Sequence, residues 1–321
     1  MLIEVKGLTK RFGDFTAVDS INLSIKEGEV FGLLGPNGAG KTTTLHMLAT
    51  LLKPTDGIAL VNGYDVVKQS DDVRKSIGIV FQEPSSDDLL TGYENLRLHA
   101  LMYGVPQANL RKKIHEVLEL VDLVDRKDDQ VKKYSGGMRR RLEIARGLLH
   151  HPKILFLDEP TLGLDPQTRE HMWKYIEDLV KKKKITIIIT THYMEEADRL
   201  CDRIAIIDHG KTVVIDSPEK LKSELGGDIV SMKIRKPNLK AIGKLRYVKK
   251  IDRTNGVVLL TVENANKNLP EILKTIGSVE SVELHSPTLN DVFLHFTGRQ
   301  LREEQAEGGF WERATTYKVR R

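Results

Sequence analysis

Short apolar runs without helical periodicity recur along the first two thirds of the chain. They predict buried strands at Glu29–Leu34, Ser76–Phe81, Ile154–Leu157 and Ile185–Thr190. Polar and apolar positions alternate over Ile21–Ile25, which is typical of a strand with one buried face. Shorter apolar runs beside polar turns predict further strands at Gly57–Val61, Val66–Val67, Ile204–Ile207 and Thr212–Ile215.

Helical periodicity dominates the middle of the chain. From Thr91 to Leu123 apolar residues recur at helical spacing, and we interpret them as core packing: Leu110, Ile114, Val117, Leu118 and Val121. The pairs Asp165-Pro166 and Ser217-Pro218 predict two capped helix starts, because each places a capping side chain before a proline.

The last third of the chain has a different pattern. Gly226-Gly227 is the candidate domain boundary, and the strands and helix predicted beyond it form a small α+β module: Ile229–Ile234, Val257–Val262, Leu269–Ile276 and Val279–Leu284. The charged segment Leu301–Arg321 is interpreted as a frayed or partly disordered terminus.

Composition limits the class of protein. A chain of 321 residues holds one large domain with a smaller one, or two domains. Its 40% hydrophobic and 30% charged residues are ordinary for a soluble globular protein. No apolar run approaches the roughly 20 residues that span a bilayer, and the first residues lack a secretory pattern. We therefore expect a cytosolic protein whose membrane role depends on a partner.

Cysteine content and charge add two limits. The single cysteine, Cys201, excludes an internal disulfide and a cysteine zinc site, and we interpret it as a small core residue. The net charge of +5 comes from 50 basic and 45 acidic residues. An excess this mild permits a nucleic acid or an anionic membrane surface nearby but requires neither.

A glycine-rich loop follows the first buried strand and precedes a helix-forming stretch. It fits the pattern G-x-x-x-x-G-K-[ST] with Gly35, Pro36, Asn37, Gly38, Ala39, Gly40, Lys41 and Thr42. Glycines let the backbone N–H groups point at phosphate oxygens, and the helix adds the positive end of its dipole. The lysine supplies a charge for the outer phosphates, and the threonine hydroxyl is a Mg²⁺ ligand.

Polar side chains follow the other buried strands. Asp158 and Glu159 end an apolar strand, and carboxylates are costly to hold there unless they have a role. Asp158 suits Mg²⁺, and Glu159 is placed to polarise a water against the terminal phosphate. Gln82 and His192 end two further strands, where they are candidates to face the nucleotide.

Two more features have less specific chemistry. Ser135-Gly136-Gly137 opens a basic helical run and forms a second candidate anion site, because a helix start has unpaired N–H groups. Phe12 and Phe15 are expected to lie in a polar loop, Lys10–Phe15, where an aromatic ring either stacks on a purine or packs over the edge of a sheet.

In this order the motifs resemble those of the nucleotide-binding subunits of ABC transporters, over roughly Leu2 to Leu225. Gly35–Thr42 resembles the Walker A loop, and Leu155–Glu159 resembles Walker B with its catalytic glutamate. The remaining matches are Gln82 to the Q-loop, Ser135–Gly137 to the signature motif, Leu164-Asp165 to the D-loop, His192 to the switch histidine and Phe12 to the adenine-stacking aromatic.

The resemblance implies an α/β P-loop NTPase fold of the ABC type, with an inserted α-helical subdomain and a small C-terminal α+β module. The implied domains are residues 1–225 for the nucleotide-binding domain, with the helical subdomain at about 86–150, then 226–300 for the accessory domain and 301–321 for the charged tail. The inserted helices account for the long separation between Lys41 and Asp158.

The resemblance also implies a Mg²⁺-dependent ATPase. The implied metal ligands are Thr42, Gln82 and Asp158, and the implied catalytic residues are Lys41, Gln82, Glu159 and His192. The implied nucleotide contacts are Phe12, Gly35, Pro36, Asn37, Gly38, Ala39, Gly40, Lys41, Thr42, Thr43, Ser135, Gly136, Gly137 and Asp165.

In such proteins two subunits pair head to tail, and each ATP lies between the Walker motifs of one and the signature motif of the other. This chain has one copy of each motif, so the resemblance implies a homodimer. It also implies a separate integral membrane permease as partner, a cytoplasmic location on the inner face of the membrane, and no nucleic acid. The transported substrate is not readable, because its contacts belong to the permease.

The chain departs from the usual signature, which begins with leucine and ends with glutamine, at Tyr134 and Met138. This variant, with Arg139–Arg141 after it, is similar to the ATPase subunits of daunorubicin-resistance type exporters. The stretch Ser286–Leu294, followed by Thr297-Gly298-Arg299, also resembles the end of that group. We therefore expect export of a small molecule such as a drug or a lipid.

Three alternatives remain. One is an importer ATPase whose C-terminal module is regulatory. Another is a soluble ABC protein acting on ribosomes or DNA, although such proteins usually carry two cassettes or a long coiled coil. The third is a non-catalytic regulatory subunit, against which the intact Glu159 and His192 argue.

Overall fold

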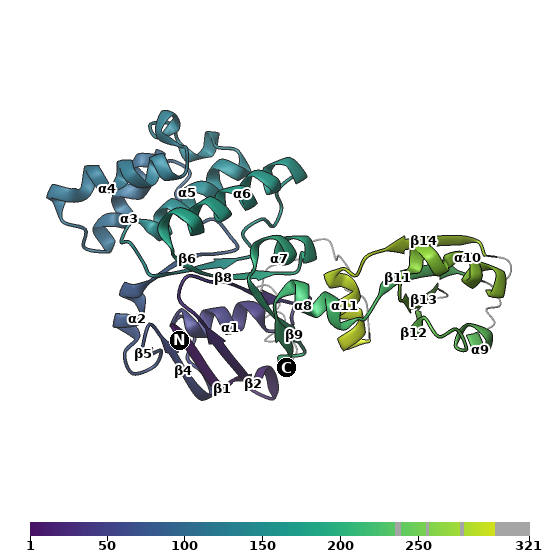
Figure 1. The fold of residues 1–321 in the computed structure, drawn as a ribbon. Coiled ribbons are helices and arrows are strands. Elements are labelled where there is room, and N and C mark those ends of the chain that lie inside the picture. The colour runs from purple at the N-terminus through teal and green to yellow at the C-terminus, as the bar shows by residue number, and fades with distance from the viewer. Residues whose placement is uncertain (235–238, 255–256, 277–278, 299–321) are drawn as a thin grey trace, which may run out of the picture.

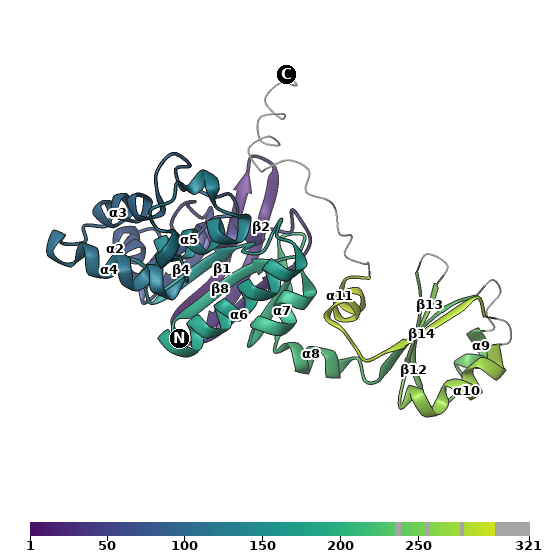
Figure 2. The same cartoon turned by 90° about the horizontal axis from the view of Figure 1, so that it is seen from above.

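The computed structural model describes residues 1–234, 239–254, 257–276 and 279–298, so the charged tail at 301–321 lies outside the described residues. A large part with two sheets and a helical layer occupies one side, and a small sheet with its own helices lies beside it (Figures 1 and 2). No helix in the described ranges has the length and apolar content to cross a bilayer.

The central sheet has six strands in the order β10-β9-β3-β8-β7-β6. Their bounds are Val30–Leu34 for β3, Ile77–Val80 for β6, Ile154–Asp158 for β7, Thr186–Thr191 for β8, Arg203–Asp208 for β9 and Lys211–Asp216 for β10. All neighbours pair in parallel except β9 and β10. Strands β3, β7 and β8 are buried along their whole length, which explains their continuous apolar runs.

The second sheet is antiparallel, in the order β2-β1-β4-β5. Its strands are Ile3–Phe12 for β1, Phe15–Ile25 for β2, Asp56–Val61 for β4 and Tyr64–Asp65 for β5. Helix α1, at Lys41–Leu48, packs in one apolar cluster with both sheets through Leu45, Met47 and Leu48.

Two expectations for this region are wrong. Phe12 and Phe15 do not lie in a polar loop, because β1 and β2 continue to the hairpin turn and pair these two residues with each other. The strand expected at Val66–Val67 instead lies at Tyr64–Asp65, directly after the turn at Asn62-Gly63, because a two-residue turn starts the returning strand at once.

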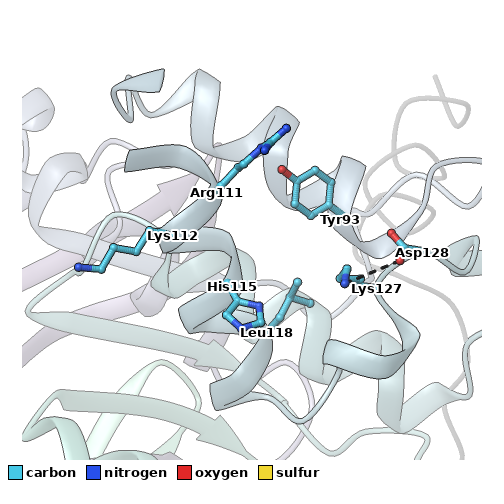
Figure 3. A pocket seen from close by; sticks show the side chains of 7 residues that line it. All are labelled: Tyr93, Arg111, Lys112, His115, Leu118, Lys127 and Asp128. Carbon is cyan, nitrogen blue, oxygen red and sulfur yellow. Dashed lines mark ion pairs between the residues drawn. The ribbon is translucent and has the colours of Figure 1, made fainter. Parts of the chain in front are cut away.

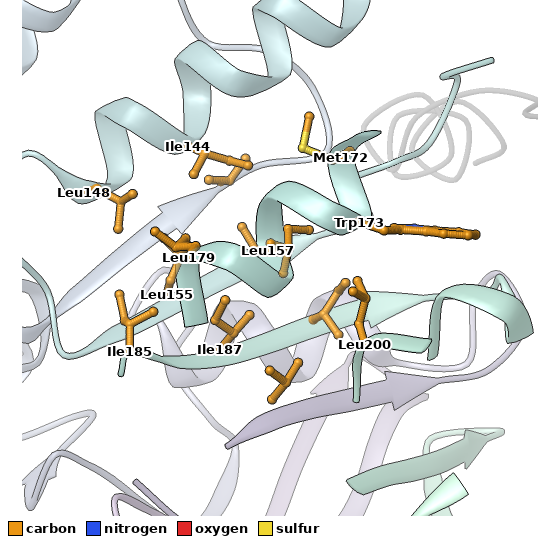
Figure 4. Close-up of a cluster of buried hydrophobic side chains, with 14 of the residues drawn as sticks. Ile144, Leu148, Leu155, Leu157, Met172, Trp173, Leu179, Ile185, Ile187 and Leu200 are labelled. Carbon is orange, nitrogen blue, oxygen red and sulfur yellow. The ribbon is translucent and has the colours of Figure 1, made fainter. Parts of the chain in front are cut away.

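A layer of helices covers the other face of the central sheet. It contains α3 at Gly92–Met102, α4 at Gln107–Leu120, α5 at Gly136–Leu148, α6 at Pro166–Lys183 and α7 at Met194–Leu200, with the short helices η1 at Val124–Arg126 and η2 at Val131–Lys133. Helix α2, at Ser70–Ser76, instead lies beside β5 and β6, and its Val73 belongs to the apolar cluster that contains α1. Figure 4 shows Ile144 and Leu148 of α5 and Trp173 of α6 above Leu155 and Leu157 of β7. Burial of each such aliphatic side chain contributes about 1.5–3 kcal/mol.

The capped helix starts expected from the sequence are present. The Asp165 side chain accepts a hydrogen bond from the Thr168 N–H at the start of α6. The Ser217 hydroxyl accepts one from the Lys220 N–H at the start of α8, which spans Pro218–Glu224. These caps satisfy orphan backbone donors and fix where the two helices begin.

The small sheet is antiparallel, in the order β12-β13-β11-β14. Its strands are Asp228–Lys233 for β11, Val248–Thr254 for β12, Val257–Val262 for β13 and Ser281–His285 for β14, with helices α9 at Leu239–Ile242 and α10 at Ala265–Ile276. Val230, Leu260 and Ile272 belong to a separate apolar core between the sheet and α10. The structure thus contains the strands and helix expected beyond Gly227.

The last described helix, α11 at Leu289–Thr297, returns to the large part and packs against α7, α8 and β10. Its buried side chains Leu289, Val292 and Phe293 belong to the apolar cluster between the central sheet and the helical layer. The division at residues 225 and 226 remains a prediction. The small sheet comes after residue 226 in the chain, but α11, which follows the small sheet, packs against helices and a strand that precede residue 226.

Candidate nucleotide-binding site

The phosphate loop connects β3 to α1 and is held tightly against neighbouring backbone. Gly38 and Gly40 have φ angles of 79° and 103°, in the left-handed region that favours glycine. A Cβ atom on Gly35 would lie 2.2 Å from the Ile207 carbonyl oxygen, and one on Gly40 would lie 2.6 Å from the Ala17 carbonyl oxygen. The glycines therefore allow both the loop conformation and its close contact with β9 and β2.

The start of α1 is open to a ligand. No side chain caps it at Gly40, so the first N–H groups of the helix, from Lys41 to Thr43, have no partner inside the helix. Pro36 is half-buried and its carbonyl accepts the Ala39 N–H at 3.2 Å, whereas Asn37 and Gly38 are exposed. An uncapped helix start of this kind is an anion site.

Lys41 is buried and turned back onto the loop. Its Nζ atom donates to the Gly35 and Pro36 carbonyl oxygens at 2.9 and 3.1 Å and lies 3.4 Å from Oε1 of Glu159. Burial lowers the pKa of Lys41, while the charges of Glu159 and Asp158 oppose that shift. The ammonium is thus held among oxygens that a phosphate group can replace.

Two oxygen ligands suited to Mg²⁺ meet at the end of β7. The Thr42 hydroxyl donates to Oδ1 of Asp158 at 2.9 Å, and the Thr190 hydroxyl donates to the same atom at 2.5 Å. His46 Nε2 lies 3.9 Å from Oδ2 of Asp158. Within the described ranges no cluster of three or more His, Cys, Asp or Glu forms a closed metal site. Mg²⁺ is usually held by one or two protein oxygens together with phosphate oxygens and water, and Thr42 and Asp158 offer such oxygens.

Glu159 is the most constrained residue of the site. Its φ of 47° lies in the left-handed region, and its N–H donates to the Thr190 carbonyl and hydroxyl oxygens at 3.1 and 3.0 Å. Its Oε2 atom lies 2.8 Å from Nδ1 of His192. Burial favours a raised pKa for Glu159, but the contact with His192 and the charge of Lys41 outweigh it and hold that pKa below its usual value. The carboxylate is therefore ionised at neutral pH.

Gln82 is not brought to the metal-binding oxygens. Its side chain is exposed, and among the described residues none makes a hydrogen bond with its amide group. Its backbone carbonyl lies 3.5 Å from Nη1 of Arg140. Its assignment as a metal ligand and catalytic residue stays a prediction.

The signature residues lie on the helical layer, at the start of α5. The Ser135 hydroxyl accepts the Met138 N–H at 3.3 Å, and Ser135 and Gly136 are exposed while Gly137 is buried against Thr168. In the part of the chain that the structure describes, no hydrogen bond or ion pair joins Ser135 to the phosphate loop. The second candidate anion site thus lies on a different element from the first, at the start of α5.

Asp165 and Phe12 lie at the periphery. Asp165 is an exposed cap of α6, and hydrogen bonds from Thr168 hold its pKa below the usual value. Phe12 is 38% exposed, with the Lys10 ammonium 5.0 Å from its ring centre. An exposed ring with a nearby cation suits stacking on a nucleotide base.

Three residues in and around this site carry no motif in the sequence. Thr190 forms hydrogen bonds with the Asp158 side chain and the Glu159 backbone. Its position two residues before His192, at the end of the same strand, is the one sequence feature that points to the site. Arg140 donates to the carbonyl oxygens of Asp158 and Glu159 but was noted only as part of a basic run. Glu196 is fully buried and accepts hydrogen bonds from Thr161 and Trp173, and no local pattern marks it.

A separate open depression of about 580 Å³ lies on the helical layer (Figure 3). None of the predicted nucleotide or metal contacts lines it; the lining residues are Tyr93, Arg111, Lys112, His115, Leu118, Lys127 and Asp128. The candidate nucleotide-binding site is thus not this depression. It is formed by the phosphate loop and the ends of β6, β7 and β8, where the predicted contacts lie.

Family models match two parts of the chain. The model described as ABC transporter matches residues 18–162, and the model described as the C-terminal domain of DrrA1-3-like ATP-binding proteins matches residues 217–297. The two matches together reach from the second strand of the large part to α11.

Similar proteins cover nearly the whole chain. The daunorubicin resistance ATP-binding protein DrrA2 of Streptomyces coeruleorubidus is 38% identical over 95% of this chain and 98% of its own. The Nod factor export ATP-binding protein I of Ralstonia nicotianae is 38% identical over 94% and 95%. A solved dimer of the ATP-binding cassette MJ0796 with ADP and Pi superimposes with a TM-score of 0.60 at 29% identity, over 67% of this chain and 98% of that one.

Proposed function

The chain belongs to the family of ABC transporter ATP-binding proteins, and on that premise we propose that it energises export of a small molecule through a separate membrane permease. As a member of this family it binds and hydrolyses ATP. The observation that carries the proposal is the convergence of Lys41, Asp158, Glu159 and His192 at one edge of the central sheet.

The residues divide the work of hydrolysis. Lys41 exchanges its two loop carbonyls for phosphate oxygens, and the open start of α1 donates N–H groups to the same phosphates. A bound Mg²⁺, held through Thr42 and Asp158, supplies charge neutralisation of the phosphates. Glu159 orients or activates the attacking water, and His192 holds that carboxylate in place and reaches the terminal phosphate. Positioning and electrostatics provide most of the rate enhancement.

The site is incomplete within one subunit. Ser135 and Gly136 are exposed at the start of α5 and make no contact with the phosphate loop among the described residues. We propose a head-to-tail homodimer in which these residues close the ATP site of the other subunit. The MJ0796 cassette, which is similar to this chain, forms a dimer.

Mixing two inactive variants tests the composite site. Lys41→Ala removes the phosphate-binding charge, and Ser135→Arg blocks the signature surface. Each variant alone therefore forms a homodimer in which neither site works. A heterodimer of the two has one site with both lesions and one intact site. An equal mixture is expected to regain about a quarter of the wild-type sites if subunits pair at random. A mixture of proteins that exchange subunits but traps no ATP contradicts the proposal.

The permease would dock on the apolar surface of the helical layer. Leu98, Leu101 and Met102 are 52%, 46% and 75% exposed on α3, and Leu89 before the helix is 69% exposed. Apolar side chains grouped in this way mark an interaction surface. Docking there would hold the protein on the cytoplasmic face of the membrane.

Export is favoured over import by the C-terminal match. Residues 217–297 match the C-terminal domain of DrrA1-3-like proteins, and two similar proteins are named for drug resistance and for Nod factor export. Reconstitution with the permease in inverted vesicles distinguishes the directions, because export then appears as ATP-dependent uptake. Stimulation of the ATPase by ribosomes or DNA instead would favour the soluble alternative.

A further inference from the structure

Arg140 is a buried cation without a carboxylate partner. It lies on α5, one turn after Ser135, and is 6% exposed. No carboxylate in the described ranges forms an ion pair with it, although Glu143, Asp158 and Glu159 are near enough to influence its pKa. Burial lowers that pKa to about 10, so the guanidinium is charged at neutral pH. A buried charge needs hydrogen-bond partners to offset its desolvation.

Backbone carbonyl oxygens supply those partners, and they come from two loops. Nε donates to the Pro160 oxygen at 2.7 Å, and Nη2 donates to the Asp158 and Glu159 oxygens at 2.8 Å each. Nη1 donates to the Phe81 oxygen and, at 3.5 Å, to the Gln82 oxygen. Every nitrogen of the guanidinium is thus used, and both the β6 end and the β7 end are bound to α5.

The contact with Glu159 acts on a backbone that is already constrained. The Glu159 N–H is held by Thr190, and its carbonyl oxygen is held by Arg140 on the other side of the residue. A left-handed conformation of a non-glycine residue persists only where the surroundings enforce it. These two sets of hydrogen bonds fix the peptide planes on both sides of Glu159 and hence the direction of its side chain.

The same helix also holds the rest of the segment after β6. Glu143 accepts hydrogen bonds from the Ser85 hydroxyl and the Ser86 N–H, each at 2.9 Å, and Arg146 donates to the Ser85 hydroxyl at 2.7 Å. Because Arg140 holds the start of this segment and Glu143 its end, α5 and residues 81–86 form one connected unit.

We propose that Arg140 is a positioning residue that links the signature surface of a subunit to the catalytic carboxylate of that same subunit. The inference rests on the proposed composite site. ATP held by the partner contacts Ser135–Gly137 and fixes the start of α5, and Arg140, one turn along, transmits that position to the backbone of Glu159. The two ATP sites of the dimer are therefore mechanically connected within each subunit.

Arg140→Lys is the main test. A lysine keeps the charge but has three donors on one nitrogen and cannot bind both loops at once. Turnover is expected to fall roughly 10- to 100-fold, because a misplacement of about 1 Å at a reacting group costs that order of rate. ATP affinity and the KM for ATP are expected to stay within about threefold, since Arg140 bonds no residue of the phosphate loop and contacts Gln82 and Asp158 only through their backbone carbonyls.

Arg141→Lys is the matched control. This neighbouring arginine donates to the Val121 and Asp122 carbonyl oxygens at the end of α4, away from the catalytic edge. It undergoes the same chemical change in the same helix and is expected to retain turnover within about twofold of wild type.

Arg140→Ala provides a second measurement, rescue of turnover by added guanidinium ion. A purely structural role of Arg140 would give no such rescue. The lost guanidinium leaves a cavity with free carbonyl oxygens, so added guanidinium ion is expected to raise turnover in this variant and not in wild type. Turnover of Arg140→Lys within about twofold of wild type overturns the inference. So does an equal loss of ATP affinity and turnover in both Arg140 variants. An inactive wild type would instead overturn the proposed function, so the two failures are distinguishable.

Discussion

Oε2 of Glu159 lies 2.8 Å from Nδ1 of His192, and Oε1 of the same carboxylate lies 3.4 Å from Nζ of Lys41. One carboxylate thus joins the end of β7, the end of β8 and the phosphate loop. We expect a bound nucleotide to replace the contact with Lys41, because phosphate oxygens attract the ammonium more strongly than a single carboxylate does. Glu159 is then oriented by His192 and by its fixed backbone.

Glu159→Gln is expected to bind ATP normally and to hydrolyse it at least about 100-fold more slowly. The amide keeps the shape of the side chain but removes the base, a loss that typically costs 10²- to 10⁴-fold. Fluorescent-nucleotide binding and phosphate release measure the two effects separately. Wild-type turnover in this variant would exclude Glu159 as the catalytic carboxylate.

Thr42→Val is expected to raise the Mg²⁺ concentration that gives half-maximal ATPase activity. The change keeps the size of the side chain but removes the hydroxyl that lies 2.9 Å from Asp158. A Mg²⁺ titration at saturating ATP measures the shift. Thr275→Val, whose hydroxyl bonds only within α10, is the control and should titrate like wild type. Identical curves for all three proteins would remove Thr42 from the proposed Mg²⁺ site.

Leu98→Lys combined with Met102→Lys is expected to abolish co-purification with the permease while basal ATPase activity stays unchanged. The charges are placed on the exposed apolar surface of α3, and none of the predicted nucleotide contacts lies on that helix. Val282→Lys, on an exposed position of β14, is the control. Retained co-purification of the double variant would place the permease contact elsewhere.

Phe293→Ala is expected to lower the free energy of unfolding by about 3–5 kcal/mol, as deletion of a buried aromatic ring usually does. Phe293 is 1% exposed in the cluster that joins α11 to the large part. Chemical denaturation measures the loss. His295→Ala, exposed on the same helix, should stay within about 0.5 kcal/mol of wild type. Equal stability of both variants would mean that α11 does not hold its packed position.

His99 is expected to make stability depend on pH. Burial, together with the charge of Arg146 and nearby His150, lowers the pKa of His99 to about 4. The unfolded chain therefore binds the proton first, so stability is full above about pH 6.5 and falls as the pH drops towards 4. In that window, His99→Gln should reduce the slope of the unfolding free energy against pH by up to about 1.4 kcal/mol per pH unit.

Urea unfolding between pH 7 and pH 5 measures this slope. Burial also lowers the pKa of His150. The Tyr103 ring contacts the His150 ring on one side and the His99 ring on the other. Replacement of both histidines should therefore reduce the pH dependence of the unfolding free energy further. His115→Gln, at a histidine that is 55% exposed, is the control. Parallel curves for wild type and His99→Gln would contradict the prediction.

The sequence was most informative where chemistry depends on neighbours along the chain. The phosphate loop, the strand ends at Asp158 and His192, and the caps at Asp165 and Ser217 are local patterns, and the structure contains the corresponding elements. Fold and family followed from the order of these motifs.

Features that depend on contacts between distant segments could not be predicted. Strand β12 has polar residues on both faces at the edge of its sheet, so it lacks the alternation that marks β11. Arg140 looked like one of three surface arginines, because its carbonyl partners lie 18 to 59 residues away along the chain. The left-handed conformation of Glu159 likewise comes from Thr190 and Arg140 and has no sequence pattern of its own.

The small sheet begins and ends at adjacent points. Its first strand, β11, pairs with its last, β14, so that Ile229 faces His285 across one strand spacing of about 4.8 Å. The chain enters the sheet from α8 and leaves it towards α11, and those two helices pack together. Residues 228–285 therefore have the geometry of an exchangeable insert. A tight turn in their place would leave α11 seated, and another domain with neighbouring ends would fit the same position without disturbing the ATPase.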